Sequence, residues 1–238
     1  MSIKHTRQTT GILFILGAVL VNIPYTLLIM NFDYPDILRK PAGEILERFA
    51  AGGSSLTWTW LSFAWVGLPL LFAILLLPKV LNDESPLGLL ALFFGAVGAF
   101  VQMVGLLRWP FVVPILARLY IDPQASAATQ EAVVAVFQAI HQYGGVVLGE
   151  HIGQLFSILW MVLLSLGLLK NELFPRWFPL AGFAASIVYF LAQGELLATA
   201  IPGFPVWDAA GLVGSLMWLA WMFALGVLLL KVKKETYE

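Results

Sequence analysis

Six apolar stretches, each long enough to cross a membrane, dominate the sequence. A helix of roughly 20 mostly apolar residues spans the hydrocarbon core of a bilayer and satisfies its own backbone hydrogen bonds there. The sequence therefore predicts an all-α fold, a polytopic membrane helical bundle with six transmembrane helices. The six stretches cover approximately residues 11–31, 56–79, 87–108, 146–169, 178–200 and 209–231.

The scarcity of charge supports this interpretation. Of the 238 residues, 60% are hydrophobic and 11% are charged, whereas about 25% of residues are charged in a soluble domain. So few charges cannot cover a water-facing surface, and we expect the outer surface to contact membrane lipid. The net charge is −1 and the basic residues form no long run, which argues against a nucleic-acid partner. The chain has no cysteine, which excludes disulfides, thiolate metal sites and cysteine nucleophiles.

The first apolar stretch resembles a signal peptide but is predicted to be retained. Lys4, His5 and Arg7 precede it, as in a signal peptide. However, the apolar run continues from Gly11 to about Met30 and lacks a small-x-small cleavage site. We interpret it as the first transmembrane helix. No internal repeat or soluble segment follows, so residues 1–238 are predicted to form a single six-helix transmembrane domain.

The distribution of Lys and Arg predicts the orientation. With a cytoplasmic N-terminus, eight of these residues fall on the inner side and five on the outer side, in agreement with the positive-inside rule. Both termini are therefore predicted to be cytoplasmic. The inner residues are Lys4, Arg7, Lys79, Lys170, Arg176, Lys231, Lys233 and Lys234, and the outer residues are Arg39, Lys40, Arg48, Arg108 and Arg118.

Two predicted outer connections are longer than a turn. The connection from Phe32 to Ser55 contains a short amphipathic helix over residues 42–51, and the next contains a helix over residues 126–143 with Ser126 as its N-cap. We expect these one or two outer amphipathic helices to lie at the interface or to cap the bundle. The inner connections are short, so a site is expected on the outer side.

Proline and tryptophan positions add detail to the helices. Pro24 and Pro69 are predicted to kink the first and second helices, because proline interrupts the helical hydrogen bonds. Tryptophan near helix ends is typical of an aromatic belt at the membrane interface. The tryptophans interpreted in this way are Trp58, Trp60, Trp65, Trp109, Trp177 and Trp207.

Ionisable and amide side chains gather toward the predicted outer ends of the helices. An unpaired charge in hydrocarbon costs on the order of a few kcal/mol, so intramembrane charges are either paired or functional. The inner halves of the same helices hold almost no ionisable residue. The candidate ligand-binding residues are Arg108, His141, Glu150, His151, Gln154 and Glu195, and the amide of Gln193 lies beside the last of them.

One interpretation of this group is ligand binding. Arg108 would pair with an anionic group, while Glu150, His151, Gln154 and Glu195 would orient the ligand. Glu150 and Gln154 lie four residues apart and would share a face of an α-helix. A structural interpretation is equally open: Arg108 and Glu150 would pair to fix helix packing, beside a small-residue stripe of Gly145, Gly149 and Gly153.

A second interpretation is a membrane-embedded enzyme. His141, Glu150, His151 and Glu195 would be the ligands of a divalent metal such as zinc, iron or manganese, the cofactor itself being unknown. Against this, adjacent Glu150 and His151 point about 100° apart on an α-helix, and no His-Glu-x-x-His sequence occurs. The same residues would also suit general acid–base chemistry, although no nucleophile is apparent. Whether the protein is an enzyme stays undecided.

Three segments carry a resemblance to a known family: residues 32–39 (FDYPDILR), 107–111 (LRWPF) and 149–153 (GEHIG). They resemble an uncharacterised family of bacterial integral membrane proteins, domain of unknown function 4386. The resemblance implies a multi-pass protein of the bacterial plasma (inner) membrane and implies no activity.

The leading prediction is therefore an outward-facing polar pocket that binds a small molecule or a lipid headgroup. The alternatives are the enzyme above and a structural or regulatory partner of another membrane protein, with the partner unknown. A transporter is less favoured, because the inner halves offer no polar route.

Overall fold

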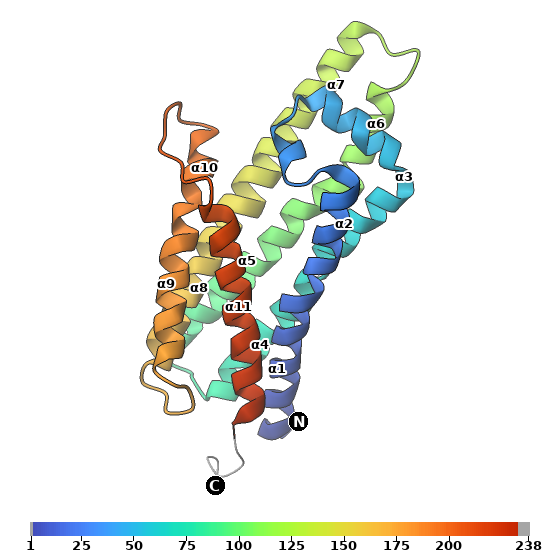
Figure 1. Cartoon of the computed structure of the whole chain (residues 1–238). Helices are drawn as coiled ribbons and strands as arrows, with labels where there is room; N and C mark the ends of the chain where they lie inside the picture. The colour runs from blue at the N-terminus through green and yellow to red at the C-terminus, as the bar shows by residue number, and fades with distance from the viewer. Residues whose placement is uncertain (1, 233–238) are drawn as a thin grey trace. The chain divides into compact units, whose positions relative to one another are not determined.

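The computed structural model describes residues 2–232, all of them in helices, turns or connections without a strand. Six long apolar segments are suited to crossing a membrane: Ile3–Phe32, Ala42–Leu81, Pro86–Tyr120, Ala127–Leu168, Trp177–Ala198 and Ala210–Lys231. They confirm the prediction of an all-α, multi-pass membrane bundle (Figure 1). Lys233 and Lys234, two of the predicted inner cations, lie outside the described residues.

The helices follow one another along the chain with short connections. In chain order they are α1 (Ile3–Leu20), α2 (Asn22–Phe32), η1 (Asp36–Arg39), α3 (Ala42–Trp65), α4 (Gly67–Leu81), α5 (Pro86–Phe111), α6 (Val113–Tyr120), α7 (Ala127–Ile140), η2 (His141–Ile152), α8 (Gly153–Leu168), α9 (Trp177–Leu191), α10 (Gln193–Ala198) and α11 (Ala210–Lys231).

The chain divides into two compact units. Unit 1 consists of residues 1–19, 68–100 and 151–238, and unit 2 consists of residues 20–67 and 101–150. In unit 1, α9 packs against both α8 and α11; in unit 2, α3 packs against α2, α6 and α7. The prediction of one domain over residues 1–238 stays a prediction.

The helix is interrupted close to both prolines that were predicted to kink it. Helix α1 ends at Leu20, four residues before Pro24, and α3 ends at Trp65, four residues before Pro69. Proline lacks the N–H that would bond the carbonyl four residues earlier, and its ring clashes with that carbonyl. The helix therefore stops at that carbonyl and starts again beyond it.

The first predicted outer helix is the beginning of α3. Its predicted end, near residue 51, is followed by Gly53 with φ 56° and ψ −148°, which lies outside the helical region. Only glycine adopts such angles at little cost. Two helical segments therefore meet at Gly53 within α3.

The second predicted outer helix has the expected start but not the expected end. The Ser126 hydroxyl accepts a hydrogen bond of 3.1 Å from the backbone N–H of Thr129, which confirms the N-cap. We expected a separate helix to end near residue 143. Instead α7 continues into the π-helix η2 and then into α8, so residues 127–168 form one uninterrupted helical segment.

Each unit has its own aromatic core. In unit 1, the rings of Phe178 and Trp221 stack with centroids 4.8 Å apart, and Trp221 Nε1 donates to the Phe178 carbonyl. In unit 2, Trp60 and Trp109 stack at 4.5 Å. These two tryptophans are fully buried, at 0% and 1% exposed. Their assignment to an interfacial belt was therefore wrong: they fill a core formed by α3, α5 and their neighbours. The other four belt candidates are exposed.

Candidate functional site

Arg108 is the most deeply buried charged group of the predicted site. It lies near the end of α5 in unit 2, with 8% of its surface exposed. Its Nη1 donates a hydrogen bond of 2.6 Å to the carbonyl of Gly105, and its guanidinium lies 5.3 Å from the Trp109 ring. Its buried Nε has no hydrogen-bond partner among the described residues. An unpaired buried N–H costs about 1–3 kcal/mol, and more when the group is charged.

Glycines bring the backbone of α5 against the π-helix η2. A Cβ at Gly105 would lie 2.5 Å from the Cα of Gly149 and 2.8 Å from the carbonyl oxygen of Gly144. A Cβ at Gly145 would collide with the Arg108 guanidinium. Two glycines of the predicted small-residue stripe, Gly145 and Gly149, thus serve close packing. A π-helix forms i→i+5 hydrogen bonds and is usually one turn long, often at a functional site; η2 covers 12 residues.

His141 opens the π-helix and lies in the same aromatic surroundings. Its ring stacks on Phe137 with centroids 5.5 Å apart and meets the edge of Trp109 at 6.0 Å. Its Nδ1 is buried without a hydrogen-bond partner in the described part of the chain, and so is Nε1 of Trp60. Trp60, His141 and Arg108 all contact Trp109. Three side chains that contact the Trp109 ring in unit 2 therefore each carry a buried nitrogen without a hydrogen-bond partner among the described residues.

Glu150 completes the predicted group in unit 2. The guanidinium of Arg108 is attracted to the Glu150 carboxylate and interacts with Tyr34 as well. The pairing of Arg108 and Glu150 in helix packing stays a prediction, which this electrostatic attraction supports. This attraction does not satisfy every polar atom of Arg108, because its Nε lacks a hydrogen-bond partner within residues 2–232.

Two of the other predicted residues, His151 and Gln154, are joined in a hydrogen-bonded chain in unit 1. His151 Nδ1 lies 2.6 Å from Oε1 of Gln193, and Gln193 Nε2 donates to Oε1 of Gln154 at 3.0 Å. Since Oε1 only accepts, the His151 ring donates from Nδ1. Glu195 follows on α10, with Oε2 3.9 Å from the place of a Cβ on Gly211. Gln193, which the ligand prediction leaves out, is the residue that joins the group.

The predicted site residues are thus divided between the units. Arg108, His141 and Glu150 belong to unit 2, whereas His151, Gln154 and Glu195 belong to unit 1. The shared face expected for Glu150 and Gln154 assumed an α-helical period, and η2 has a different period up to residue 152. Adjacent Glu150 and His151 have different neighbours, as expected from their divergent directions.

Within residues 2–232, no three His, Asp or Glu side chains are arranged to hold a metal ion. The predicted ligands His141 and Glu150 lie in unit 2, and His151 and Glu195 lie in unit 1. The metal-dependent version of the enzyme hypothesis therefore gains no support from these positions.

Replacing Gln193 by leucine tests the hydrogen-bonded chain of unit 1. Gln193 is 4% exposed and bonds the part-buried side chains of His151 and Gln154, which the substitution leaves without this partner. We expect a loss of about 1–3 kcal/mol in the free energy of unfolding, measured in detergent. The exposed Gln8, changed to leucine, is the control and should alter stability by less than about 0.5 kcal/mol. Equal effects of the two changes would contradict a structural role for the chain.

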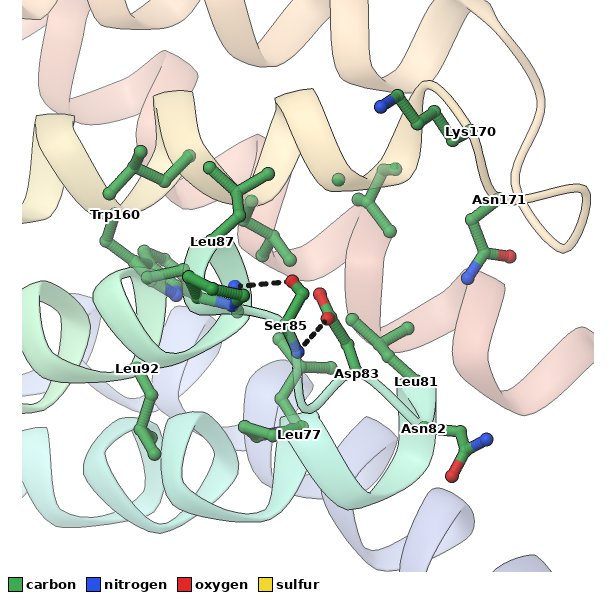
Figure 2. A pocket seen from close by; sticks show the side chains of 18 of the residues that line it. Leu77, Leu81, Asn82, Asp83, Ser85, Leu87, Leu92, Trp160, Lys170 and Asn171 are labelled. Atoms are coloured by element: carbon green, nitrogen blue, oxygen red, sulfur yellow. Dashed lines mark hydrogen bonds between the residues drawn. The ribbon is translucent and has the colours of Figure 1, made fainter.

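A cavity at the other end of α8 in unit 1 was not anticipated from the sequence. It has a volume of about 810 Å³ and lies between the α4–α5 turn and the C-terminal half of α8 (Figure 2). Residues 82–86 and 171–175 lie in the short predicted inner connections, where no site was expected. The polar residues of these connections were the available sequence signal for a cavity, but the signal is not specific, because turns are polar in most proteins.

Comparison with known proteins identifies a family. The chain matches the family model described as "Domain of unknown function (DUF4386)" over residues 9–226. No curated protein and no solved structure matches the chain.

Proposed function

The chain belongs to the family described as domain of unknown function DUF4386, and we propose that this multi-pass membrane protein binds a small molecule or lipid headgroup at Arg108. The observation that carries the proposal is the buried Nε of Arg108, which has no hydrogen-bond partner among residues 2–232. Buried polar groups in proteins are almost always hydrogen-bonded. The guanidinium of Arg108, with one N–H unpaired, is therefore suited to donate a hydrogen bond to a ligand.

The surrounding groups favour a ligand rich in hydrogen-bond acceptors. The guanidinium can donate from Nε and Nη2 side by side, which is the geometry that binds a carboxylate or a phosphate through two oxygens. Nε1 of Trp60 is a donor, and Nδ1 of His141 is a donor in one of its two tautomers. The three side chains that carry these nitrogens all contact Trp109. A ligand with an anionic oxygen group would thus supply the hydrogen-bond acceptors that these donors lack.

Glu150 sets a second requirement on the ligand. Its carboxylate attracts Arg108 and balances the charge of the guanidinium. A purely anionic ligand would meet repulsion from Glu150, whereas a ligand that also carries a hydroxyl or amine would donate to it. We therefore propose a ligand with both an anionic oxygen group and a neighbouring donor, as many lipid headgroups have.

The site is proposed to face outward in a bacterial inner membrane. The greater number of Lys and Arg on the inner side, eight against five, supports cytoplasmic termini. With the N-terminus inside, the end of α5 that holds Arg108 lies on the outer side, because the N-terminal and second spans precede it in alternating directions.

Mass spectrometry of compounds that copurify with the protein tests the proposal. The wild-type protein in mild detergent should retain an anionic ligand, and Arg108→Met should retain at least about tenfold less, because it loses a charge-assisted pair of hydrogen bonds. Arg108→Lys should retain an intermediate amount, since lysine keeps the charge but not the planar fork. Arg118→Met, which removes an exposed cation from the same unit, is the control.

The same experiment separates binding from a structural role. If Arg108→Met copurifies with the same compounds in the same amounts as wild type, the proposed binding at Arg108 is wrong. A wild-type protein free of ligand, together with a lower unfolding temperature for Arg108→Met, would favour the structural alternative. In that case, Arg108 and Glu150 would act only in packing.

A further inference from the structure

The cavity of unit 1 has an apolar interior and a polar mouth. Its volume of about 810 Å³ lies within the range of ligand pockets, about 300–1,000 Å³. The inner wall includes Leu77, Leu92 and Trp160, and the mouth is formed by residues 82–86 and 170–172 (Figure 2). Each ionisable residue that lines the cavity lies in one of these two mouth segments. The cavity is therefore shaped for a molecule with one apolar end and one polar end.

A glycine on α8 keeps the cavity open. A Cβ at Gly167 would have only one heavy atom within 4 Å, Oδ2 of Asp83 at 3.8 Å. A side chain at this position would thus enter empty space rather than a neighbouring helix. Gly167 is consequently a position where the cavity can be filled without disturbing the packing of α8.

The carboxylate of Asp83 is held in place at the mouth. Its Oδ1 accepts a hydrogen bond of 3.0 Å from the backbone N–H of Ser85, and the Ser85 hydroxyl accepts one of 3.1 Å from the N–H of Gly88 (Figure 2). A Cβ at Gly88 would lie 2.7 Å from Cγ of Asp83, so glycine makes room for the carboxylate there. Its Oδ2 is the atom nearest to the open space at Gly167. The negative charge therefore has a fixed position beside the cavity.

The charges at the mouth have both signs. Asp83 and Glu172 are acidic, and Lys170 is basic and exposed at the end of α8. Figure 2 shows Lys170 and Asn171 on one side of the mouth and Asn82, Asp83 and Ser85 on the other. Two carboxylates suit an amine, and the single ammonium suits a phosphate. A headgroup that carries an amine and a phosphate a few bonds apart complements this arrangement.

The mouth also lies where such headgroups are found. Helix α4 ends at Leu81 and α5 begins at Pro86, so the mouth segment joins the ends of two membrane-spanning segments. Lipid headgroups lie at this level, while their acyl chains extend toward the bilayer centre. A lipid at the mouth would place its chain in the direction of the apolar wall at Trp160.

We infer that this cavity is a binding site for a zwitterionic glycerophospholipid with an amine-bearing headgroup, one of whose acyl chains occupies the apolar interior beside Trp160. The headgroup amine lies against Asp83 and Glu172, and the phosphate lies against Lys170. The inference goes beyond the proposed function. It depends on residues of unit 1 alone, so it stands or falls independently of Arg108.

Quenching of Trp160 fluorescence by brominated lipid tests the inference. Trp160 lines the cavity and is 2% exposed, so a brominated acyl chain inside the cavity comes closer to the ring than one in the surrounding bilayer and quenches it more strongly. The protein is reconstituted in vesicles of phosphatidylethanolamine and phosphatidylglycerol, in which either lipid carries the bromine while the composition stays the same. The Trp160 contribution is the quenching of wild type minus that of Trp160→Phe. This contribution should be about two- to fivefold larger when phosphatidylethanolamine is brominated than when phosphatidylglycerol is brominated. A partly exposed ion pair changes affinity by about this factor.

Three variants separate entry into the cavity from recognition of the headgroup. Gly167→Leu should abolish the Trp160 contribution for both lipids, whereas Leu169→Phe, which adds bulk to an exposed neighbour outside the lining, should leave it unchanged. The double variant Asp83→Asn and Glu172→Gln should keep the quenching but lose the preference between lipids. The amide introduced by Asp83→Asn retains an oxygen for the N–H of Ser85, so the turn is preserved.

Three results would overturn the inference. The first is a Trp160 contribution of zero with both lipids. The second is a contribution that is equal for the two lipids or larger for phosphatidylglycerol. The third is a contribution that persists in Gly167→Leu. If Gly167→Leu does not fold, the double variant still decides the question, because an unchanged preference for phosphatidylethanolamine would exclude the assigned role of the two carboxylates.

Discussion

Replacing Trp109 by alanine is expected to destabilise the protein by about 3 kcal/mol, because it removes a fully buried ring from the core of unit 2. Trp109 is 1% exposed and stacks on Trp60, with Phe32 and Phe49 also in ring contact. In a membrane the transfer of the ring from water contributes little, but the lost dispersion contacts remain lost. For a chain of this length, the unfolding temperature in detergent should fall by roughly 6–12 °C.

Trp58→Ala is the matched control for this prediction. Trp58 lies on α3 in the same unit and is 65% exposed, so alanine leaves no cavity there. Its effect on stability should be within about 0.5 kcal/mol. If the two substitutions lower the unfolding temperature equally, Trp109 does not have the core position that the structure assigns to it.

A reduced amount of copurified ligand in Trp109→Ala is also expected, since Trp109 borders Arg108.

The second large effect is expected for Gly105→Val, which should cost about 3 kcal/mol or more. A Cβ at this position would lie 2.5 Å from the Cα of Gly149, so two backbones would have to separate. Overpacking of a core costs about 1–3 kcal/mol where side chains can move, and the backbone of η2 has less freedom than a side chain. Unfolding in detergent, followed by circular dichroism, measures the loss.

Gly144→Ala is the control for Gly105→Val. The closest atom to a Cβ at Gly144 is Cδ of Arg108 at 3.6 Å, an ordinary contact distance. We expect a change within about 0.5 kcal/mol. Gly105→Ala should lie between the two, because it adds the colliding Cβ without further branches. A Gly105→Val protein as stable as wild type would show that α5 and η2 do not pack backbone to backbone.

Local chemistry made much of the fold predictable. The six spans were recognisable because a membrane-spanning helix needs an uninterrupted apolar length. The helix breaks at Leu20 and Trp65 followed from Pro24 and Pro69, since the effect of proline acts within four residues. Ser126 was recognised as an N-cap for the same reason: its hydroxyl bonds an N–H three residues away.

The continuous helix over Ala127–Leu168 and the burial of Trp60 were not predictable in this way. The sequence between residues 140 and 153 contains three glycines, which usually indicate an interruption, yet they form the contact surface of a π-helix. Trp60 and Trp58 differ little in sequence context, but one lies in a core and the other is exposed. They are distinguished only by whether another helix packs against the face of α3 on which each tryptophan lies.

The sequence alone determined the class of the protein, its spans, its kinks and the identity of its polar residues. These depend on apolar length and on neighbours a few residues away. Tertiary structure alone decided which polar residues meet: Arg108 lies against η2 and near Glu150, whereas His151 bonds Gln193. It also decided that turns at Asp83 and Lys170 enclose a cavity. The physical reason is that a sequence period gives the direction of a side chain on its own helix but not the helix that it will face.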